Sequence, residues 1–559
     1  MAGQENNICR VGGKILVAAN GPDASFYNDL SFYGMVYNQD ELAAIAGRAA
    51  QNNAQLVYEL IFKLGLEEAL KRIDGVFALS YFDGRDLILA HDHFGVCPLF
   101  YAEIKGELVF ATQLQAITGY PGFVKIVNSE ALSAYIRYNW VPANLCIFES
   151  VNKLKPGHYV RISAAKAATQ TIFYDPVQVA LSAQESRFSQ SDEKIIEELL
   201  ALLRRMVDTR LSDEAARGLL LSGGIDSSLL AILLKERGPV NSYTIGFPQA
   251  SFSEAHYAAD TARLNGFNHH QAILDGEKAL DILPHLLNVY EEPYADQSQI
   301  PTMAAMQLAR PHNHILWLGD AGDEFFLGYP RHLSHAKYYL PHSSQTGKCS
   351  KLTHMAHPWR TFLALLGQPV RYIQRHQTNP EYSELLLNWR TPNLELDAFN
   401  HIYDIDNPSR QAGLFDVLLL LTGSGVIKSS RLAASLSMGL RTPLLSYKLF
   451  NFAQRLPMRL LAAEGKGKIV FRKILENYYP PEWINRPKSG FGAPVGQWLQ
   501  KEFKPWADDL LSEEEINRQG YFSMAQIKLY RSQLGRRGSA TNKLWAILMF
   551  QTWARREGL

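Results

Sequence analysis

The segment LLLSGGIDSS, residues 219–228, joins a short apolar run to two glycines and then to the helical pattern SSLLAILLKERG. An apolar strand that passes through glycines directly into a helix is typical of a parallel sheet with helices on both faces. Gly223 and Gly224 let the backbone turn tightly and expose its amides, and the helix N-terminus adds partial positive charge. The segment therefore predicts a loop that binds phosphate.

Asp226 lies inside this predicted anion site, where a carboxylate is expected only if a cation binds as well. Mg²⁺ bridging the carboxylate and the phosphates would meet that condition. The loop is not a Walker A loop, because no GxxxxGK followed by Ser or Thr occurs here. The alternative is an ordinary strand-to-helix turn with an Asp or Ser N-cap.

The pattern on either side of the loop predicts two domains. VNSYTIGF (240–247) and HILWLGDAGDE (314–324) indicate further buried strands, so residues 190–559 are expected to form an α/β domain around a parallel sheet. Residues 1–180 show short β-rich runs broken by turns, with helical periodicity between them, and predict a layered α+β domain. The polar stretch SAQESRFSQSDEK (182–194) is expected to be a linker.

Composition excludes several function classes. The net charge is +1, with 47% hydrophobic and 20% charged residues, which gives no electrostatic reason for a nucleic-acid or membrane partner. The N-terminus lacks a secretory pattern and no continuous apolar run reaches the length of a spanning helix, so a cytoplasmic enzyme is expected. A homodimer is compatible with the sequence. The four cysteines are widely spaced and predict free thiols rather than a metal site: Cys9, Cys97, Cys146 and Cys349.

Several motifs in the second half resemble one family. SGGIDSS resembles the pyrophosphate loop of the N-type ATP pyrophosphatases, and LGDAGDEFFLGYPR (318–331) resembles the asparagine synthetase stretch SGEGADELFGGYxR. Further matching segments, in chain order, are SYTIGF (242–247), EEPYADQSQIPT (291–302), RLAASLSMGLRTPLLSYKLFNFAQRLP (431–457), KGKIVFRKIL (466–475) and INRPKSGFGAPVGQWL (484–499). The chain is thereby identified as a member of the asparagine synthetase superfamily. The resemblance implies a doubly wound ATP pyrophosphatase domain with extra helices, which uses ATP and Mg²⁺ to adenylate a carboxylate.

The resemblance also assigns site residues. It implies that Mg²⁺ is held by Asp226 and Asp323, and that Lys468 meets pyrophosphate and the charged intermediate. Such a lysine is reasonable because negative charge builds on the phosphates during the reaction. The alternative interpretation of Lys468 is a lysine on a helix surface exposed to solvent. The alternative interpretation of Asp323 is a helix N-cap. The residues implied to bind ATP are Leu221, Ser222, Gly223, Gly224, Asp226, Ser227, Ile245 and Gly319.

Residues 31–116 resemble the glutaminase domain of the same enzymes. The matching segments are FYGMVYNQDEL (32–42), IDGVFALSYFD (73–83) and DHFGVCPLFY (92–101). The family's nucleophile is a cysteine directly after Met1, whereas this chain has Ala2, and Tyr33 stands where the family has its oxyanion-hole asparagine. Exposure of Cys9 by processing is disfavoured, because CRVGG matches the family start poorly. We therefore expect an inactive Ntn-type sandwich that is retained as a scaffold.

Without a glutaminase, the attacking amine comes from the substrate or from free ammonia. The favoured hypothesis is an amide synthetase that closes an intramolecular amide in a small amino-acid-derived substrate, as β-lactam synthetases do. This chain departs from those enzymes at Asp320, where they have a tyrosine paired with a glutamate and asparagine synthetases have a glutamate. Their tyrosine–glutamate base therefore cannot be transferred to this chain, and Asp320 is the candidate base, with a structural or electrostatic role as its alternative. Two other functions stay open: a lasso-type macrocyclase acting on a peptide, and an ammonia-dependent asparagine synthetase or amidotransferase.

Overall fold

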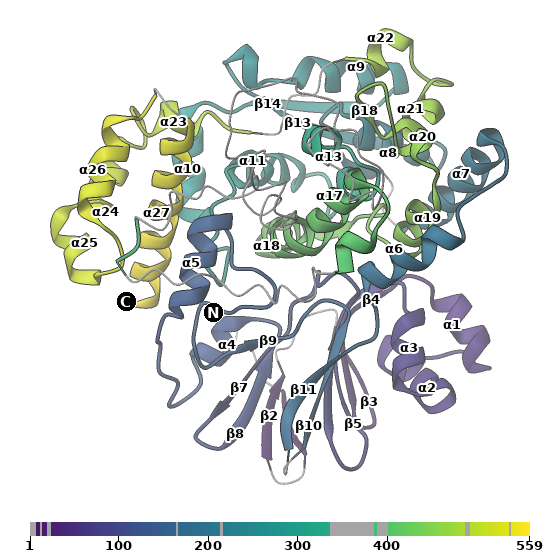
Figure 1. Ribbon diagram of the computed structural model, residues 1–559, viewed down its shortest axis with the longest axis horizontal. Helices are drawn as coiled ribbons and strands as arrows, with labels where there is room; N and C mark the ends of the chain where they lie inside the picture. Colours follow the sequence, from purple (N-terminus) through teal and green to yellow (C-terminus); the bar gives the residue numbers. More distant parts are fainter. Residues whose placement is uncertain are drawn as a thin grey trace, which may run out of the picture.

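The computed structural model describes residues 7–11, 14–18, 24–163, 166–212, 216–335, 385–387, 401–486, 492–535 and 538–559. Figure 1 shows two parts stacked on one another, with long antiparallel strands below and helices around a second sheet above. The predicted fold class is confirmed, because an α+β sandwich precedes a domain built on a parallel sheet.

The lower part contains a six-stranded antiparallel sheet in the order β11-β10-β6-β5-β4-β3. Its strands are β3 (Ala24–Tyr27), β4 (Leu30–Val36), β5 (Gly75–Phe82), β6 (Leu87–His91), β10 (His158–Ser163) and β11 (Lys166–Ile172). A smaller sheet, β8-β7-β9, packs on it through buried residues such as Leu89, Leu99 and Val160. The remaining strands are β1 (Asn7–Val11), β2 (Lys14–Ala18), β7 (Phe100–Ile104), β8 (Glu107–Ala111) and β9 (Asn152–Lys153).

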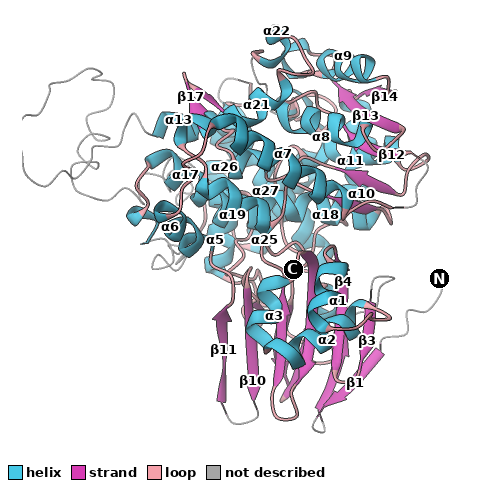
Figure 2. Ribbon diagram, turned by 90° about the vertical axis from the view of Figure 1, so that its right-hand side faces the viewer, coloured by secondary structure: helices cyan, strands magenta, loops and turns pink. Residues whose placement is uncertain are grey.

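Helices cover the six-stranded sheet on its outer side (Figure 2). In α2 the buried residues Ala54, Val57 and Ile61 are spaced three and four apart, which gives the helix one apolar face. The helices of this part are α1 (Gln39–Ala46), α2 (Asn53–Leu64), α3 (Leu66–Arg72), α4 (Leu114–Thr118) and α5 (Ser129–Tyr138).

The upper part is built on a five-stranded parallel sheet in the order β14-β13-β12-β15-β16. The chain runs outward from β12 to β14 and then returns to β15 on the other side of β12. In such doubly wound sheets, ligands bind at the carboxyl ends of the strands where the order reverses. The strands are β12 (Arg217–Leu220), β13 (Val240–Gly246), β14 (Asn268–Ile273), β15 (Ile315–Trp317) and β16 (Gly439–Arg441).

Helices surround this sheet, and a hairpin lies beside it. The first group is α7 (Asp192–Asp208), α8 (Ile225–Lys235), α9 (Ala255–Asn265), α10 (Gly276–Leu286), α11 (Gln299–Ala309), α12 (Gly322–Phe325) and α13 (Pro330–His335). The second group is α19 (Tyr447–Arg455), α20 (Met458–Leu461), α21 (Ile469–Leu475), α22 (Pro481–Ile484) and α23 (Val495–Trp498). The hairpin consists of β17 (Ala462–Ala463) and β18 (Lys466–Gly467).

One long helix, Pro408–Ser435, crosses the upper part. It consists of α17 (Pro408–Asp416), the π-helix η4 (Val417–Gly425) and α18 (Val426–Ser435). Among the described residues it is the one helix with the length and mean hydropathy of a membrane span, and 72% of its apolar window is buried in the protein. Packing in the core therefore accounts for its apolar character.

The C-terminal helices reach back to the lower part. They are α24 (Lys504–Leu510), α25 (Glu513–Gln519), α26 (Met524–Ser532) and α27 (Gly538–Glu557). Figure 1 shows α27 beside α5, and the Tyr135 hydroxyl donates a hydrogen bond of 2.6 Å to the Ala546 carbonyl.

The structure corrects the prediction that residues 182–194 form a linker. Helix α6 (Pro176–Glu185) occupies its first residues and α7 begins at Asp192, so only 186–191 connects them. The Phe188 side chain anchors this connection to the protein. Its ring is buried, and its centroid lies 4.6 Å from that of the Phe452 ring. Polar composition alone did not reveal that buried anchor.

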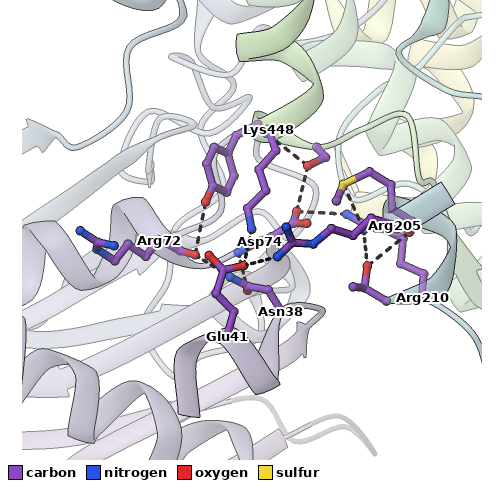
Figure 3. Close-up of polar contacts among 11 residues, drawn as sticks. Asn38, Glu41, Arg72, Asp74, Arg205, Arg210 and Lys448 are labelled. Carbon is purple, nitrogen blue, oxygen red and sulfur yellow. Dashed lines mark hydrogen bonds and ion pairs between the residues drawn. The ribbon is translucent and has the colours of Figure 1, made fainter. Parts of the chain in front are cut away.

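A polar cluster joins the two parts (Figure 3). Asp74 is 3% exposed, and its carboxylate accepts hydrogen bonds from Arg210 at 3.0 Å and from Ser446 at 3.2 Å. The Arg210 guanidinium also lies over the Tyr37 ring, and the Arg441 side chain donates to the Arg210 carbonyl. Since Arg441 ends β16, the cluster connects the lower part directly to the parallel sheet.

A second pair of contacts lies beside it at the surface. The Glu41 carboxylate accepts from Arg205 at 3.0 Å and from Lys448 at 2.6 Å, and its side chain is 36% exposed. The buried Asp74–Arg210 pair and the two more exposed pairs of Glu41, with Arg205 and with Lys448, thus lie at the same interface (Figure 3).

Candidate active site

The glycine loop follows β12 and leads into α8, as the sequence predicts. Gly223 has φ of +73°, and a Cβ there would lie 2.7 Å from the Ala258 nitrogen, so only glycine fits. The Gly224 amide donates to the Ser222 hydroxyl at 3.2 Å, and the Ser222 and Ser227 hydroxyls lie 3.1 Å apart. The loop is therefore wrapped tightly around the N-terminus of an 11-residue helix, which favours anion binding.

Ile245 lies near this loop. Its strand β13 pairs with β12 as far as Tyr243, and the Leu221 amide donates to the Tyr243 carbonyl at 3.0 Å. Ile245 is 5% exposed and lies beyond the end of β12. Its assignment to adenine binding stays a prediction.

A second loop, 318–321, follows β15 and packs against the first turn of α8. A Cβ on Gly319 would lie 2.9 Å from the Asp226 Cβ, and one on Gly322 would lie 2.5 Å from the Asp226 carboxyl carbon. Ala321 has the left-handed φ of +79° that starts α12. Because β12 and β15 are adjacent parallel strands, both loops meet at the same edge of the sheet.

Lys468 lies between the two acidic residues predicted from the sequence. Its ammonium nitrogen is 2.5 Å from Asp226 Oδ2 and 2.6 Å from Asp323 Oδ1, and the residue is 5% exposed. Burial alone lowers the pKa of Lys468, but the carboxylates of Asp226 and Asp323 outweigh it and hold the pKa above its ordinary value. The solvated-lysine alternative is therefore wrong for this structure.

The backbone holds Lys468 in an unusual conformation. The residue follows the hairpin β17–β18 and precedes α21, with a left-handed φ of +56°. Its amide donates to the Phe326 carbonyl at 3.0 Å. A Cβ on Gly328 would lie 2.2 Å from Lys468 Cε. The lysine side chain therefore packs directly against the backbone of Gly328, where a larger residue would not fit.

The two carboxylates fit a magnesium ion. Mg²⁺ is usually held by one or two carboxylates together with substrate phosphates, and Asp226 and Asp323 both reach one ammonium group beside the glycine loop. Among the described residues, no group of three or more His, Cys, Asp or Glu side chains gathers to form a metal site of protein ligands alone. The donor set therefore suits a metal that arrives with the nucleotide.

Asp320 belongs to a neighbouring cluster that the sequence analysis missed. Burial raises the pKa of the Asp320 carboxyl, against the Lys428 ammonium and a hydrogen bond from Ser429, which lower it. Lys428 Nζ lies 2.9 Å from Ser298 Oγ and 3.5 Å from Asp296 Oδ2. The matching segment EEPYADQSQIPT contains Asp296 and Ser298, but no motif singled out these two residues or Lys428.

The inactivity of the glutaminase site in the lower part stays a prediction, and the structure places only some of its residues. Tyr33 lies on β4, opposite Ala24 and Ala78, and lines a small cavity with apolar neighbours. Cys97 and Cys146 are buried, and burial raises the pKa of the Cys146 thiol. Ala2 and the side chain of Cys9 lie outside the described residues.

A doubly wound sheet with a phosphate-type loop, two carboxylates and a buried lysine is the architecture of an ATP-dependent ligase. The profile of the asparagine synthase family matches residues 198–555, and a glutamine amidotransferase domain profile matches residues 22–174. The chain therefore belongs to the asparagine synthase family, whose members are ATP-dependent enzymes that form amide bonds.

Curated relatives align with the chain at low identity. Glutamine-hydrolysing asparagine synthetase 1 of Bacillus subtilis strain 168 is 25% identical, over 96% of this chain and 88% of its own length. Asparagine synthetase 2 of the same organism is 26% identical, over 82% and 61%. The amidase chyE of Penicillium rubens is 24% identical, over 53% of this chain and 46% of its own length.

Proposed function

We propose that the chain uses ATP and Mg²⁺ to adenylate the carboxylate of a small amino-acid-derived substrate, and then closes an intramolecular amide such as a β-lactam ring. It acts in the cytoplasm and does not hydrolyse glutamine. One observation carries the proposal: the ligase site keeps Lys468 between Asp226 and Asp323, while Tyr33 replaces the oxyanion donor of the lower domain.

The residues of the ligase site divide the work of adenylation. The amides of the 222–227 loop and the N-terminus of α8 bind phosphate oxygens. Asp226 and Asp323 would hold the magnesium, which would supply positive charge to the phosphates. As the substrate carboxylate bonds to the α-phosphorus, the bond between the α- and β-phosphates breaks and pyrophosphate leaves; Lys468 supplies a fixed positive charge where this negative charge grows, and its burial strengthens that interaction.

Asp320 is the proposed base for the second step. A free alkylamine has a pKa of about 10.4 and is almost entirely protonated at pH 7, so it needs a group that accepts its proton. Burial raises the pKa of Asp320, which makes its carboxylate a better proton acceptor. An amine within the same substrate also benefits from a high effective concentration.

The second candidate function is an ammonia-fed asparagine synthetase. It is favoured by relatives named glutamine-hydrolysing asparagine synthetases, one of which aligns over 96% of the chain. Both functions share the adenylation site and differ only in the source of the amine.

The test uses the full chain with ATP, Mg²⁺ and a panel of amino-acid-derived carboxylates, with hydroxylamine to trap the acyl-adenylate as a hydroxamate. AMP and pyrophosphate should appear with the correct substrate, and ADP as product would overturn the assignment. Without ammonium, mass spectrometry should find a product lighter than the substrate by one water. A product that contains one added ammonia nitrogen would instead establish the second function. Release of glutamate from glutamine would contradict the inactive lower domain.

A further inference from the structure

The lower domain touches the ligase site through a segment that takes no part in the chemistry proposed so far. Asn139 and Trp140 follow α5, and Asn139 has a left-handed φ of +73° that turns the chain toward the upper part. The Asn139 carbonyl accepts a hydrogen bond of 2.8 Å from the Ala295 amide. The segment therefore contacts the stretch 294–298, which contains Asp296 and Ser298 and leads into α11.

Trp140 also contacts the long helix. A Cβ built on Gly423 would lie 2.4 Å from the indole nitrogen of Trp140 and 2.7 Å from its Cδ1. Because no methyl group fits between them, the edge of the indole rests on the backbone of η4. Both residues line a cavity of about 50 Å³ between the two parts, together with Tyr294 and Ile427.

The contacted stretch of helix is not α-helical. Val417–Gly425 is a π-helix of nine residues. This conformation is rare, is usually one turn long and is frequent at functional sites. Bonds from each residue to the fifth residue along the chain underwind the helix, so every side chain after η4 is rotated relative to those before it. The π segment therefore decides in which direction the side chains of α18 point.

Those side chains include Lys428 and Ser429, whose positive charge and hydrogen bond, respectively, act on the Asp320 carboxyl. Lys428 lies three residues after η4 and reaches Ser298 at 2.9 Å. The Tyr294 hydroxyl fixes the same elements, because it lies 2.8 Å from Ser424 Oγ at the end of η4. Trp140 and its neighbour Asn139 thus hold the two elements, the helix and the stretch 294–298, that position the ammonium of Lys428.

We propose that Trp140 is a positioning residue through which the lower domain fixes the π-helical turn and so places Lys428 beside Asp320. The role of Lys428 at the acyl group rests on the proposed function, whereas the contact of Trp140 with the helix does not. This gives the retained lower domain a task in a chain that lacks its glutaminase residues.

Two glycines of η4 provide a matched pair of variants. Gly423→Ala places a methyl group against the indole, so the helix or the indole must move. Gly425→Ala is the control, because the nearest atom to its Cβ is Leu421 Cδ1 at an ordinary 3.4 Å. Trp140→Ala removes the contact, Trp140→Phe keeps an aromatic ring there, and Tyr174→Ala removes a different aromatic residue of the interface, whose hydroxyl donates to Asn451.

The first measurement is hydrogen exchange of the full chain without any substrate. Trp140→Ala and Gly423→Ala should each speed exchange of the amides in 417–430 and leave 447–455 unchanged. Gly425→Ala and Trp140→Phe should match the wild type in both segments, and Tyr174→Ala should affect only 447–455. Unchanged exchange in 417–430 for Trp140→Ala would overturn the proposal, whatever the activity of the chain.

The second measurement is kinetic and uses a carboxylate that the wild type converts. A misplacement of about 1 Å typically costs about 100-fold in rate, so Trp140→Ala and Gly423→Ala should lower amide formation by that order while KM for ATP stays constant. Gly423→Ala should add less than about 2-fold in the Trp140→Ala background, because residues that share one contact are not additive. Full amide formation by Trp140→Ala would overturn the positioning role. Failure of the wild type to adenylate any carboxylate would instead refute the proposed function, and the exchange data would still decide the contact.

Discussion

At the scale of single residues, the site depends on one buried ammonium between two carboxylates. Lys468 reaches Asp226 and Asp323 at 2.5 and 2.6 Å, and the removal of either acid changes both the metal ligands and the balance of buried charge. The residues are therefore coupled, and their substitutions should not be additive.

Asp323→Asn should lower the rate of AMP formation by at least about 10²-fold, because an amide is a weaker ligand for Mg²⁺ and leaves the charge of Lys468 less balanced. The measurement is AMP release at saturating ATP, with circular dichroism to show that the fold is kept. Asp260→Asn is the control, since that carboxylate is exposed on α9, where it pairs with Arg263 at 3.2 Å. Wild-type turnover of Asp323→Asn would remove the metal role.

Asp320→Asn tests the base. Amide formation should fall by roughly 10²–10⁴-fold, while ATP–pyrophosphate exchange, which reports adenylation, should persist. A base must be deprotonated, so the wild-type rate should fall as pH drops through the raised pKa of Asp320, and this acidic limb should be absent in the variant. Parallel pH profiles for the two proteins would leave Asp320 with an electrostatic role only.

His93 gives a pH-dependent contribution to stability. Its ring stacks on Tyr447 with centroids 4.5 Å apart, and burial lowers the pKa of His93 to about 4. The unfolded chain, with a histidine pKa of about 6.5, binds the proton first, so stability is lost as pH falls from about 6.5 toward 4, by up to about 3 kcal/mol. His93→Phe should keep the stacking and show a correspondingly smaller loss of the free energy of unfolding in urea. Equal losses in both proteins over that pH range would contradict this account.

At the scale of elements, the site is made by short segments that touch through glycines. α12 has only four residues, and it reaches α8 because Gly322 carries no side chain. The apolar strands and their following loops explain why both segments lie at one edge of the sheet. They do not explain how closely the segments approach.

Gly322→Ala should reduce turnover by about 10²-fold, because its methyl group would lie 2.5–2.8 Å from the Asp226 carboxylate and displace it. Gly538→Ala is the matched control, since a Cβ there has no heavy atom within 4 Å among the described residues at the start of α27. The measurement is AMP formation together with the thermal unfolding midpoint. Loss of activity in both variants would point to a general effect of the substitution rather than to this contact.

At the scale of the whole molecule, the two parts share both an apolar core and polar contacts. Phe94 of the lower part lies 5.4 Å from Phe325 of α12 and 6.1 Å from Phe450 of α19, measured between ring centroids. The Asp74–Arg210 pair adds a buried polar contact, and the Arg210 side chain is only 1% exposed. Removal of Asp74 would leave the Arg210 charge buried without its partner, which is strongly destabilising.

Asp74→Ala should lower the free energy of unfolding by about 3 kcal/mol, since it leaves the Arg210 charge buried without its carboxylate. Glu41→Ala removes the exposed carboxylate of the same interface and should cost about 1 kcal/mol or less. Urea unfolding of both variants, followed by tryptophan fluorescence, measures the difference. Equal effects would mean that the buried pair does not hold the two parts together.

Much of the fold follows from local patterns in the sequence. Apolar strands, the glycine loop and the amphipathic periodicity of α7 and α2 predict the sandwich and the parallel sheet, because each element has its own spacing of buried residues. The motif at 222–227 and the acids Asp226 and Asp323 were also identified from the sequence. Adjacent parallel strands then bring their loops together.

The sequence by itself therefore determined the class of fold and one edge of the candidate site, since these depend on residues close together in the chain. Only the tertiary structure decided that Lys468 lies between two acids about 150 and 240 positions away in the sequence, and that the charge of Lys428 acts on Asp320. The stretch VLLLLTGSG begins with five consecutive apolar residues and has no apolar stripe that fixes its rotation, so its π-helical register depends on what packs against it. That partner includes Trp140, and contacts between such distant segments are set by packing of the whole chain rather than by local pattern.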